Sequence, residues 1–155
     1  MTEIVIKPMR YLAPVSQALV TETLADLAER YGGSGDDTPV QAVEFDPPEG
    51  GFFVAYIEEW PVGCGGWRTY DDDEQVAEIK RMYTRPEARK LGVARALLVA
   101  LEESARDMGR KRIILQTGSA QPEAMALYER AGYEPIPSYG FYRDAPGARS
   151  YGRNL

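Results

Sequence analysis

Residues 75–115 limit most strongly what this chain can fold into. The segment 75–84 is rich in strand-forming residues, and over residues 91–108 apolar side chains recur at steps of three or four. This spacing predicts a helix with one stripe facing the core, and the apolar run at 113–115 predicts a strand that is buried on both faces. A strand, a helix and a second strand in this order predict a βαβ unit with parallel strands and a right-handed crossover.

The rest of the chain predicts further helices and antiparallel strands around this unit. Proline can occupy the first turn of a helix and glycine commonly follows its end. The apolar stripes after Pro14 and Pro122 therefore predict helices that end at Gly32 and Gly132. Runs of β-branched and aromatic residues predict the strands. The expected strands are 2–7, 51–57 and 62–70 before the βαβ unit, and 133–136 and 149–153 in the tail.

Residues 32–50 are predicted to form a long irregular loop, because glycine and proline are frequent there. Long loops in compact domains are often functional, and a plain surface connection is an equally good interpretation. Among the acids of this loop are Asp36, Asp37, Glu44 and Asp46.

Composition limits the classes of function. The chain has 155 residues, which suits one domain. Its 18 Lys and Arg residues against 24 Asp and Glu residues give a net charge of −6. Because phosphate binding along nucleic acid needs a net cationic face, no nucleic-acid partner is expected. The chain contains no histidine, which excludes Ser-His-Asp and Cys-His catalysis and most zinc sites.

The single cysteine, Cys64, cannot form an internal disulfide and is expected to be a small buried residue. One cysteine in a chain of this length fits a reducing compartment. The longest apolar stretches are far shorter than the roughly 20 residues that span a bilayer. Residues 1–10 lack a signal pattern. We therefore expect a cytoplasmic protein with no membrane partner.

The charges divide unevenly along the chain. Residues 1–80 carry 16 acids and 5 bases, whereas residues 81–155 carry 8 acids and 13 bases. Such a change of sign suggests two kinds of ligand or partner.

The segment 77–100 predicts a binding site for an anion. Its strand leads through a basic turn into a helix whose first turn carries the small residues Gly92 and Ala94. Exposed amide groups at a helix start bind pyrophosphate, and small residues let the ligand approach them. The pattern is neither a P-loop nor a dinucleotide fingerprint, and taken alone it is equally compatible with an ordinary basic helix start. The neighbouring bases are Arg85, Arg89, Lys90 and Arg95.

This segment resembles the central motif of the GNAT superfamily, the acyl-coenzyme A-dependent N-acyltransferases. That motif reads [RQ]-x-x-G-x-[GA] and lies between a strand and a helix, as Arg89-x-x-Gly92-x-Ala94 does here. The family's second motif has a helix with a tyrosine, followed by a Gly-aromatic pair. The order of the predicted elements matches the family too. The resemblance covers about residues 77–133, in the segments Glu78–Arg89, Leu115–Gly118, Gln121–Ala124 and Leu127–Tyr133.

The resemblance implies an α/β (α+β) fold in one domain, residues 1–155. The implied architecture is a mixed, twisted sheet of about six to seven strands, with helices on both faces and a splayed central pair of parallel strands. The implied activity is that of an enzyme, an N-acetyltransferase. It would move an acetyl group from acetyl-CoA, a co-substrate, to a primary amine by direct attack and without a metal.

In the family, backbone groups of the strand before the basic turn pair with the pantetheine arm of the cofactor. The matching positions are Met82, Tyr83 and Thr84. A bulge there would splay this strand from the next parallel one and open a slot for the thioester. The amides of the turn hold the pyrophosphate in the family. The positions implied for this role are Arg89, Lys90, Leu91, Gly92, Val93, Ala94 and Arg95.

The resemblance implies two catalytic residues. An amine must lose a proton before it attacks, and without histidine a carboxylate is the natural base. Some members use a glutamate at about the place of Glu78. This residue is also compatible with substrate recognition, or with an ion pair to Lys80 or to a tail arginine. Tyr128 matches the family's tyrosine that donates a proton or hydrogen bond to the leaving thiolate. The alternative interpretation is that Tyr128 only packs in the core.

Four residues are predicted to contact the acceptor besides Glu78: Gln116, Thr117, Trp67 and Tyr139. In the family, the tail loop and the 32–50 loop line this side, and an aromatic surface cluster is the alternative for the tail loop. Many relatives carry a glutamate where Gln116 stands, so one negative group is missing from the slot. The remaining acids of the first half are expected to attract a cationic amine.

Three activities stay open from the sequence. The first is acetylation of a small-molecule amine. The second is a non-catalytic module that binds or senses acyl-CoA, and the third is acetylation of protein N-termini or lysines. The presence of both Glu78 and Tyr128 favours an enzyme. The family often forms homodimers, which makes a homodimer possible here.

Overall fold

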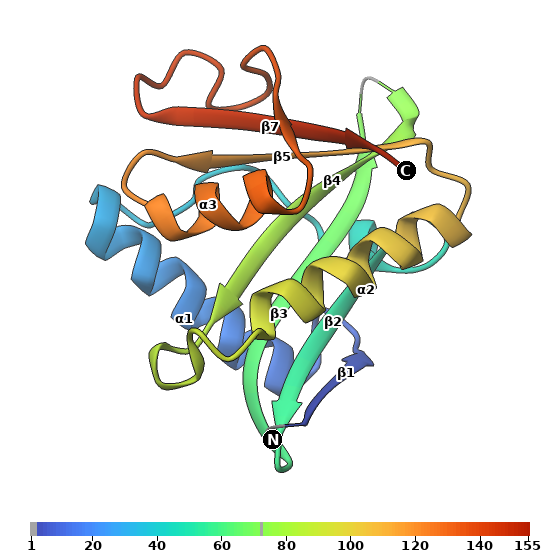
Figure 1. Ribbon diagram of the computed structural model, residues 1–155, viewed down its shortest axis with the longest axis vertical. Helices are drawn as coiled ribbons and strands as arrows, with labels where there is room; N and C mark the ends of the chain where they lie inside the picture. The colour runs from blue at the N-terminus through green and yellow to red at the C-terminus, as the bar shows by residue number, and fades with distance from the viewer. Residues whose placement is uncertain (1–2, 72) are drawn as a thin grey trace.

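The computed structural model describes residues 3–71 and 73–155. Its strands form one seven-stranded sheet in the order β1-β2-β3-β4-β5-β7-β6 (Figure 1). The helices are α1 (Pro14–Tyr31), α2 (Val93–Asp107) and α3 (Pro122–Arg130), with short 3-10 turns η1 (Ala42–Phe45) and η2 (Pro86–Ala88). The strands are β1 (Ile4–Pro8), β2 (Gly50–Ile57), β3 (Trp60–Tyr70), β4 (Asp73–Thr84), β5 (Arg112–Gly118), β6 (Glu134–Pro135) and β7 (Ala148–Asn154).

The predicted fold class is confirmed. Among the described residues, β4 and β5 are the parallel pair of the predicted βαβ unit, and every other neighbouring pair is antiparallel. The predicted helices and strands are present, with ends that differ by a few residues. Part of the predicted strand 2–7 appears as β1, whereas Thr2 lies outside the described residues.

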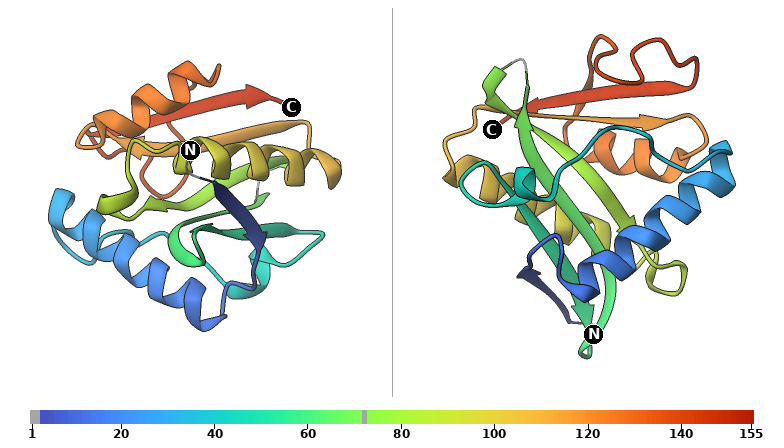
Figure 2. Two further views of the ribbon diagram at one scale, coloured as in Figure 1. Left: turned by 60° about the horizontal axis from the view of Figure 1, so that its bottom comes forward. Right: turned by 180° about the vertical axis from the view of Figure 1, so that it is seen from behind.

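Helices cover both faces of the sheet, as Figure 2 shows. On one face, α1 packs over β3 and β4, where Leu19, Phe52 and Cys64 are buried in one cluster. On the other face, α2 and α3 bury Trp67 and Leu98. Each fully buried side chain of this size contributes about 1.5–3 kcal/mol relative to exposure, so the two cores hold the central strands firmly. No helix within the described ranges has the length and apolarity needed to cross a bilayer.

The parallel pair separates soon after it forms. β4 pairs with β5 at only three positions, the last of which is Glu78 opposite Ile114. Beyond this point the register between β3 and β4 shifts by one residue, and Arg81 has a left-handed φ of 63°. A β-bulge of this kind bends the bulged strand. The end of β4 therefore turns away from β5 and leaves a slot between the two strands.

Candidate active site

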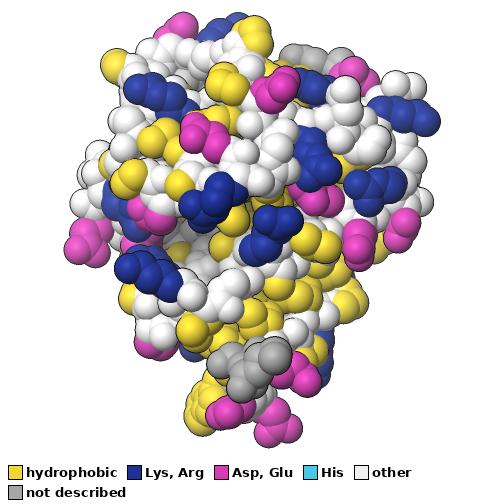
Figure 3. Space-filling model, viewed as in Figure 1, with side chains coloured by type: hydrophobic (Ala, Val, Ile, Leu, Met, Phe, Trp, Pro, Cys, Tyr) yellow, Lys and Arg dark blue, Asp and Glu magenta, His cyan; other side chains and the backbone are white. Residues whose placement is uncertain are grey.

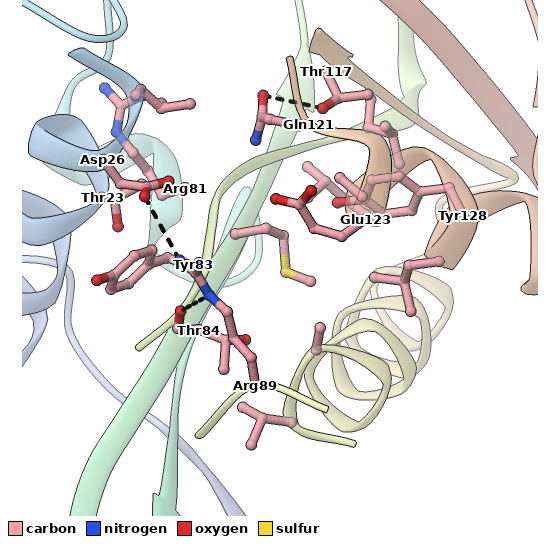
Figure 4. Close-up of a pocket in the computed structure, with 18 of the residues that line it drawn as sticks. Thr23, Asp26, Arg81, Tyr83, Thr84, Arg89, Thr117, Gln121, Glu123 and Tyr128 are labelled. Carbon is pink, nitrogen blue, oxygen red and sulfur yellow. Dashed lines mark hydrogen bonds and ion pairs between the residues drawn. The ribbon is translucent and has the colours of Figure 1, made fainter. Parts of the chain in front are cut away.

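The slot opens into a cavity of about 720 Å³ that is lined by α1, the end of β4, the start of α2, β5 and α3. Figure 3 shows Lys and Arg side chains gathered around a hollow on this face. Figure 4 shows Thr23 and Asp26 of α1 on one side of the cavity and Tyr128 of α3 on the opposite side. The splayed strands thus bring two distant parts of the chain to one site.

The start of α2 presents free backbone amides at the cavity. Gly92 precedes the helix with a left-handed φ of 94°, which glycine adopts without the steric cost of a side chain. The amides of Val93, Ala94 and Arg95 donate no hydrogen bond to another described residue, as expected for the first turn of a helix. Three free donors and the positive end of the helix dipole favour a phosphate at this place.

Acidic side chains of α1 hold the basic turn that leads to this helix. The Nη2 atom of Arg85 lies 2.7 Å from Oε2 of Glu22. The Nε atom of Arg89 donates to the carbonyl oxygen of Thr84 at 3.0 Å, and its Nη2 lies 3.6 Å from Oδ1 of Asp26. These contacts fix the turn against both α1 and β4, so that its amides face the cavity.

The cofactor positions implied by the sequence come together around the cavity, except Leu91, which is exposed and does not line it. Met82, Tyr83 and Thr84 line it where β4 no longer pairs with β5, so one edge of their backbone is free for a ligand. Lys90 and Arg95 also line it and have no acidic partner in the part of the chain that the structure describes. Free amides, free cations and a free strand edge fit the pyrophosphate and pantetheine parts of a coenzyme A thioester.

Tyr128 reaches the same cavity from α3. Its side chain is only 5% exposed, and its ring packs against the rings of Tyr133 and Tyr151. Burial raises the pKa of Tyr128 above its ordinary value, so the phenol keeps its proton at neutral pH. The hydroxyl makes no hydrogen bond to any described residue and is available to a ligand as a donor.

Glu78 lies at the point where the two parallel strands separate, on the face of the sheet opposite to Tyr128. It is 7% exposed, and its Oε1 accepts a hydrogen bond from Nε of Arg68 at 3.1 Å. The ion-pair partner is therefore Arg68 of β3, not Lys80 or a tail arginine as the sequence suggested. Arg68 also pairs with Glu44 at 3.2 Å, so the 32–50 loop closes over this carboxylate and keeps it out of the cavity lining.

The predicted acceptor residues fall into two groups. Gln116 and Thr117 line the cavity, and Nε2 of Gln116 donates to the carbonyl oxygen of Tyr139 at 3.0 Å. Tyr139 does not line the cavity; it is buried, and burial raises the pKa of its phenol above the ordinary value. Trp67 is 0% exposed and donates to Ser104 of α2 at 2.9 Å, so the structure places it in the core, away from the cavity.

The sequence does not predict the contact between Asp36, Lys80 and Arg81 at the site. Asp36, in the 32–50 loop, lies 3.1 Å from Nζ of Lys80 and 2.6 Å from Nη1 of Arg81. The sequence offered the composition of the loop as a signal, but not the contact. Asp36 and Glu78 are both paired with bases, so neither is free to attract a cationic amine as was expected. In the described ranges, no cluster of three or more acidic or cysteine side chains is arranged to hold a metal ion.

Asp36 also carries a stability prediction. Burial opposes its charge, but Lys80, the hydrogen bonds from Thr38 and then Arg81 outweigh burial and hold the pKa of this carboxyl well below its usual range. Its folded pKa lies below its unfolded value, so its stabilising effect is present above the unfolded pKa of about 4 and is lost as pH falls below it.

We expect Asp36→Asn to lower the free energy of unfolding at pH 7 by about 3–5 kcal/mol, because it leaves Lys80 and Arg81 buried without a carboxylate. The difference between wild type and variant should shrink as pH falls below about 4 in urea titrations. Asp37→Asn is the matched control, since Asp37 is the exposed neighbour in the same loop. Equal losses in the two variants at pH 7 would contradict the prediction.

Comparisons with known proteins agree with this geometry. The sequence profile described as Acetyltransferase (GNAT) family matches residues 20–133. A protein of Escherichia coli K12, named Uncharacterized N-acetyltransferase YjgM, is 37% identical over 93 residues, which are 59% of this chain and 56% of that protein. The aligned part thus spans just over half the length of this curated relative.

Solved structures extend the likeness over the chain. One from Klebsiella pneumoniae, described as a candidate acyl-CoA N-acyltransferase, is 25% identical and covers 98% of this chain and 97% of its own, with a TM-score of 0.79. A GNAT family acetyltransferase from Elizabethkingia anophelis, with acetyl-CoA bound, covers 98% of both chains with a TM-score of 0.69. The two sequences are 17% identical, and at this identity the comparison shows a shared fold alone.

Proposed function

The chain belongs to the GNAT family of acetyltransferases, and from this premise we propose that it transfers an acetyl group from acetyl-CoA to a primary amine of a small molecule. One observation carries the proposal. The free amides at the start of α2 open into the slot between β4 and β5, and the unpaired hydroxyl of Tyr128 lines the same cavity.

The residues around the slot support binding of the acetyl donor. The amides of Val93, Ala94 and Arg95 would hold the pyrophosphate, with Lys90 and Arg95 supplying charge. The free edge of β4 at residues 82–84 would pair with the amide groups of the pantetheine arm as an added strand. When bound, acetyl-CoA supplies an acetyl thioester in the slot.

The reaction needs one proton acceptor and one proton donor. The acceptor nitrogen attacks the thioester carbonyl carbon, a C–N bond forms, and the C–S bond breaks with the electron pair leaving on sulfur. We assign to Tyr128 the proton or hydrogen bond that the thiolate needs, because a buried phenol stays protonated. We assign to Glu78 the proton that leaves the nitrogen, and because this carboxylate does not line the cavity, the proton would reach it through water. The two residues flank the splayed strands from opposite faces, which separates the donor from the acceptor of protons.

The role of Glu78 is tested by a neutral replacement of the same shape. Because Glu78 is assigned the role of proton acceptor, Glu78→Gln is expected to lower kcat by about 100-fold or more and to change the dependence of kcat on pH. Steady-state kinetics over a range of pH, together with thermal melting, give the measurement. A lower Tm with an unchanged pH profile would instead identify Glu78 as the structural partner of Arg68.

The proposed function is tested by release of thiol from acetyl-CoA in the presence of a panel of small amines and of peptides with free N-termini or lysines. Turnover with small amines, confirmed by mass spectrometry of the N-acetyl product, is the expected result. Calorimetric binding of acetyl-CoA without turnover of any amine would identify a sensing module. Turnover restricted to the peptides would identify a protein acetyltransferase.

A further inference from the structure

Arg81 is a buried cation with most of its hydrogen-bonding capacity unused. It lies at the bulge of β4, its side chain is only 4% exposed, and it is among the residues that line the cavity. Its Nη1 atom donates to Oδ2 of Asp36 at 2.6 Å. Its Nε atom is buried without a partner, and its Nη2 atom donates to no described residue. An unmade hydrogen bond from a buried donor is costly, so such a group indicates a missing acceptor.

The two unused atoms form one edge of the guanidinium group. Nε and Nη2 project their N–H groups in parallel, and this fork matches the two oxygens of a carboxylate. Asp36 occupies the remaining Nη1 and is itself shared with Lys80, so two buried cations have one carboxylate between them. With the neighbouring Arg68, Glu44 and Glu78 the cluster is balanced in charge, so the feature that would take a carboxylate is the free N–H edge of Arg81 and not a net positive charge.

The acids that line the cavity in the described structure offer no free carboxylate that would favour an acceptor with a second ammonium group. Asp26 pairs with Arg30 at 3.1 Å and lies 3.6 Å from Arg89. Glu123 pairs with Arg30 at 2.6 Å. With Asp36 paired as well, every carboxylate that lines the cavity already faces a guanidinium or ammonium group. A second ammonium group on the acceptor would find no free carboxylate among the described lining residues.

From the free edge of Arg81 we propose that the acceptor is an amine that carries a carboxylate, and that Arg81 binds this carboxylate through Nε and Nη2. The inference rests on the proposed function and adds the class of its substrate. Arg81, Lys80 and Glu78 lie on the same side of β4, toward α1 and the 32–50 loop. Because Arg81 lines the cavity, a carboxylate on Arg81 would hold the amine of the same molecule near the slot between β4 and β5.

The proposal is tested with pairs of amines that differ only in the anionic group. α-Amino acids and short ω-amino acids are each compared with their carboxamides, and putrescine represents amines with a second cation. The wild type is expected to favour the acid over the amide by about tenfold or more in kcat/KM. Arg81→Lys keeps the charge but loses the fork, and is expected to remove most of this preference. Converting the carboxylate of a substrate to a carboxamide also changes the pKa of its amine. This change is the same for the wild type and for Arg81→Lys, so it cancels when their preferences are compared.

Arg106→Lys is the matched control, because Arg106 is an exposed arginine of α2 outside the cavity. This variant should keep the preference of the wild type. Calorimetric binding of acetyl-CoA should be unchanged within a few-fold in Arg81→Lys, which separates an acceptor site from a donor site. A preference for amides or putrescine, or an acid preference that Arg81→Lys leaves intact, would overturn the inference while leaving the proposed acetyltransferase in place.

A second measurement does not depend on turnover. N-acetyl amino acids and their carboxamides are titrated into the protein saturated with coenzyme A, as probes of the product complex. The acids should bind about tenfold or more tightly than the amides to the wild type, and the difference should vanish in Arg81→Lys. Equal binding of acids and amides to the wild type would overturn the inference. Acid-selective binding without amine turnover in any assay would sustain the carboxylate site and overturn the proposed transfer reaction.

Discussion

Gly92→Val is expected to abolish binding of acetyl-CoA while the protein stays folded. A Cβ at this position would contact only Cδ1 of Ile4, at 3.8 Å, so the protein itself leaves room for a small side chain. The φ of 94° is the difficulty, because a β-branched residue there costs about 1–2 kcal/mol and drives the backbone toward another conformation. The amides that follow would then turn away from the phosphate position.

Isothermal calorimetry with acetyl-CoA measures this effect, with circular dichroism as the test of folding. Gly109→Val is the matched control at the other end of α2. Gly109 has a φ of 83°, and no described atom lies within 4 Å of the position that a Cβ would take there, so the backbone strain is similar but the cavity is distant. Both variants should lose similar stability, and only Gly92→Val should lose affinity. Unchanged affinity in Gly92→Val would count against the anion site at the start of α2.

Tyr128→Phe is expected to lower kcat by about 100-fold or more while the affinity for acetyl-CoA changes by less than a few-fold. The hydroxyl makes no hydrogen bond within the described structure, so its removal breaks no internal contact. The cost falls on the step in which sulfur leaves, because a thiolate without a proton or hydrogen bond is a poorer leaving group. Thermal stability should be unchanged, since the buried ring remains in place.

Tyr133→Phe is the matched control for this prediction. Tyr133 packs against Tyr128, and its hydroxyl donates to Oε2 of Glu102 at 2.7 Å in the core. Its removal leaves a buried carboxylate with one donor fewer and should cost about 1–3 kcal/mol of stability without an effect on kcat. Steady-state kinetics and thermal melting of the two variants should therefore give opposite patterns. A similar kcat in wild type and Tyr128→Phe would remove Tyr128 from the reaction.

The helices and strands followed from the sequence because their signals are local. The stripe over residues 91–108 and the turn residues around it need no information from elsewhere in the chain, and α2 forms there as Val93–Asp107. The proposed anion site is local as well, since Gly92 and the three amides after it are consecutive. The second motif likewise placed Tyr128 on α3, where it lines the cavity.

The charged pairs could not be derived in the same way. Arg68 and Glu78 meet across the β3–β4 ladder, and the sequence alone pointed to Lys80 or a tail arginine instead. Trp67 follows a run of small residues and was expected near the acceptor, but the register of β3 turns its side chain toward α2. A shift of one residue in a strand moves a side chain to the other face, and the bulges of β3 and β4 make such shifts.

The sequence by itself determined the βαβ unit, the helix start of α2 with its free amides, and the family. Each of these depends on residues that are neighbours in the chain, through helix periodicity, free amides and the conformational freedom of one glycine. Only the tertiary structure decided which charges meet. Asp36 and Arg81 are 45 positions apart, and their contact exists because a loop folds over a bulged strand. The free edge of Arg81, and with it the inferred class of acceptor, follows from that long-range packing.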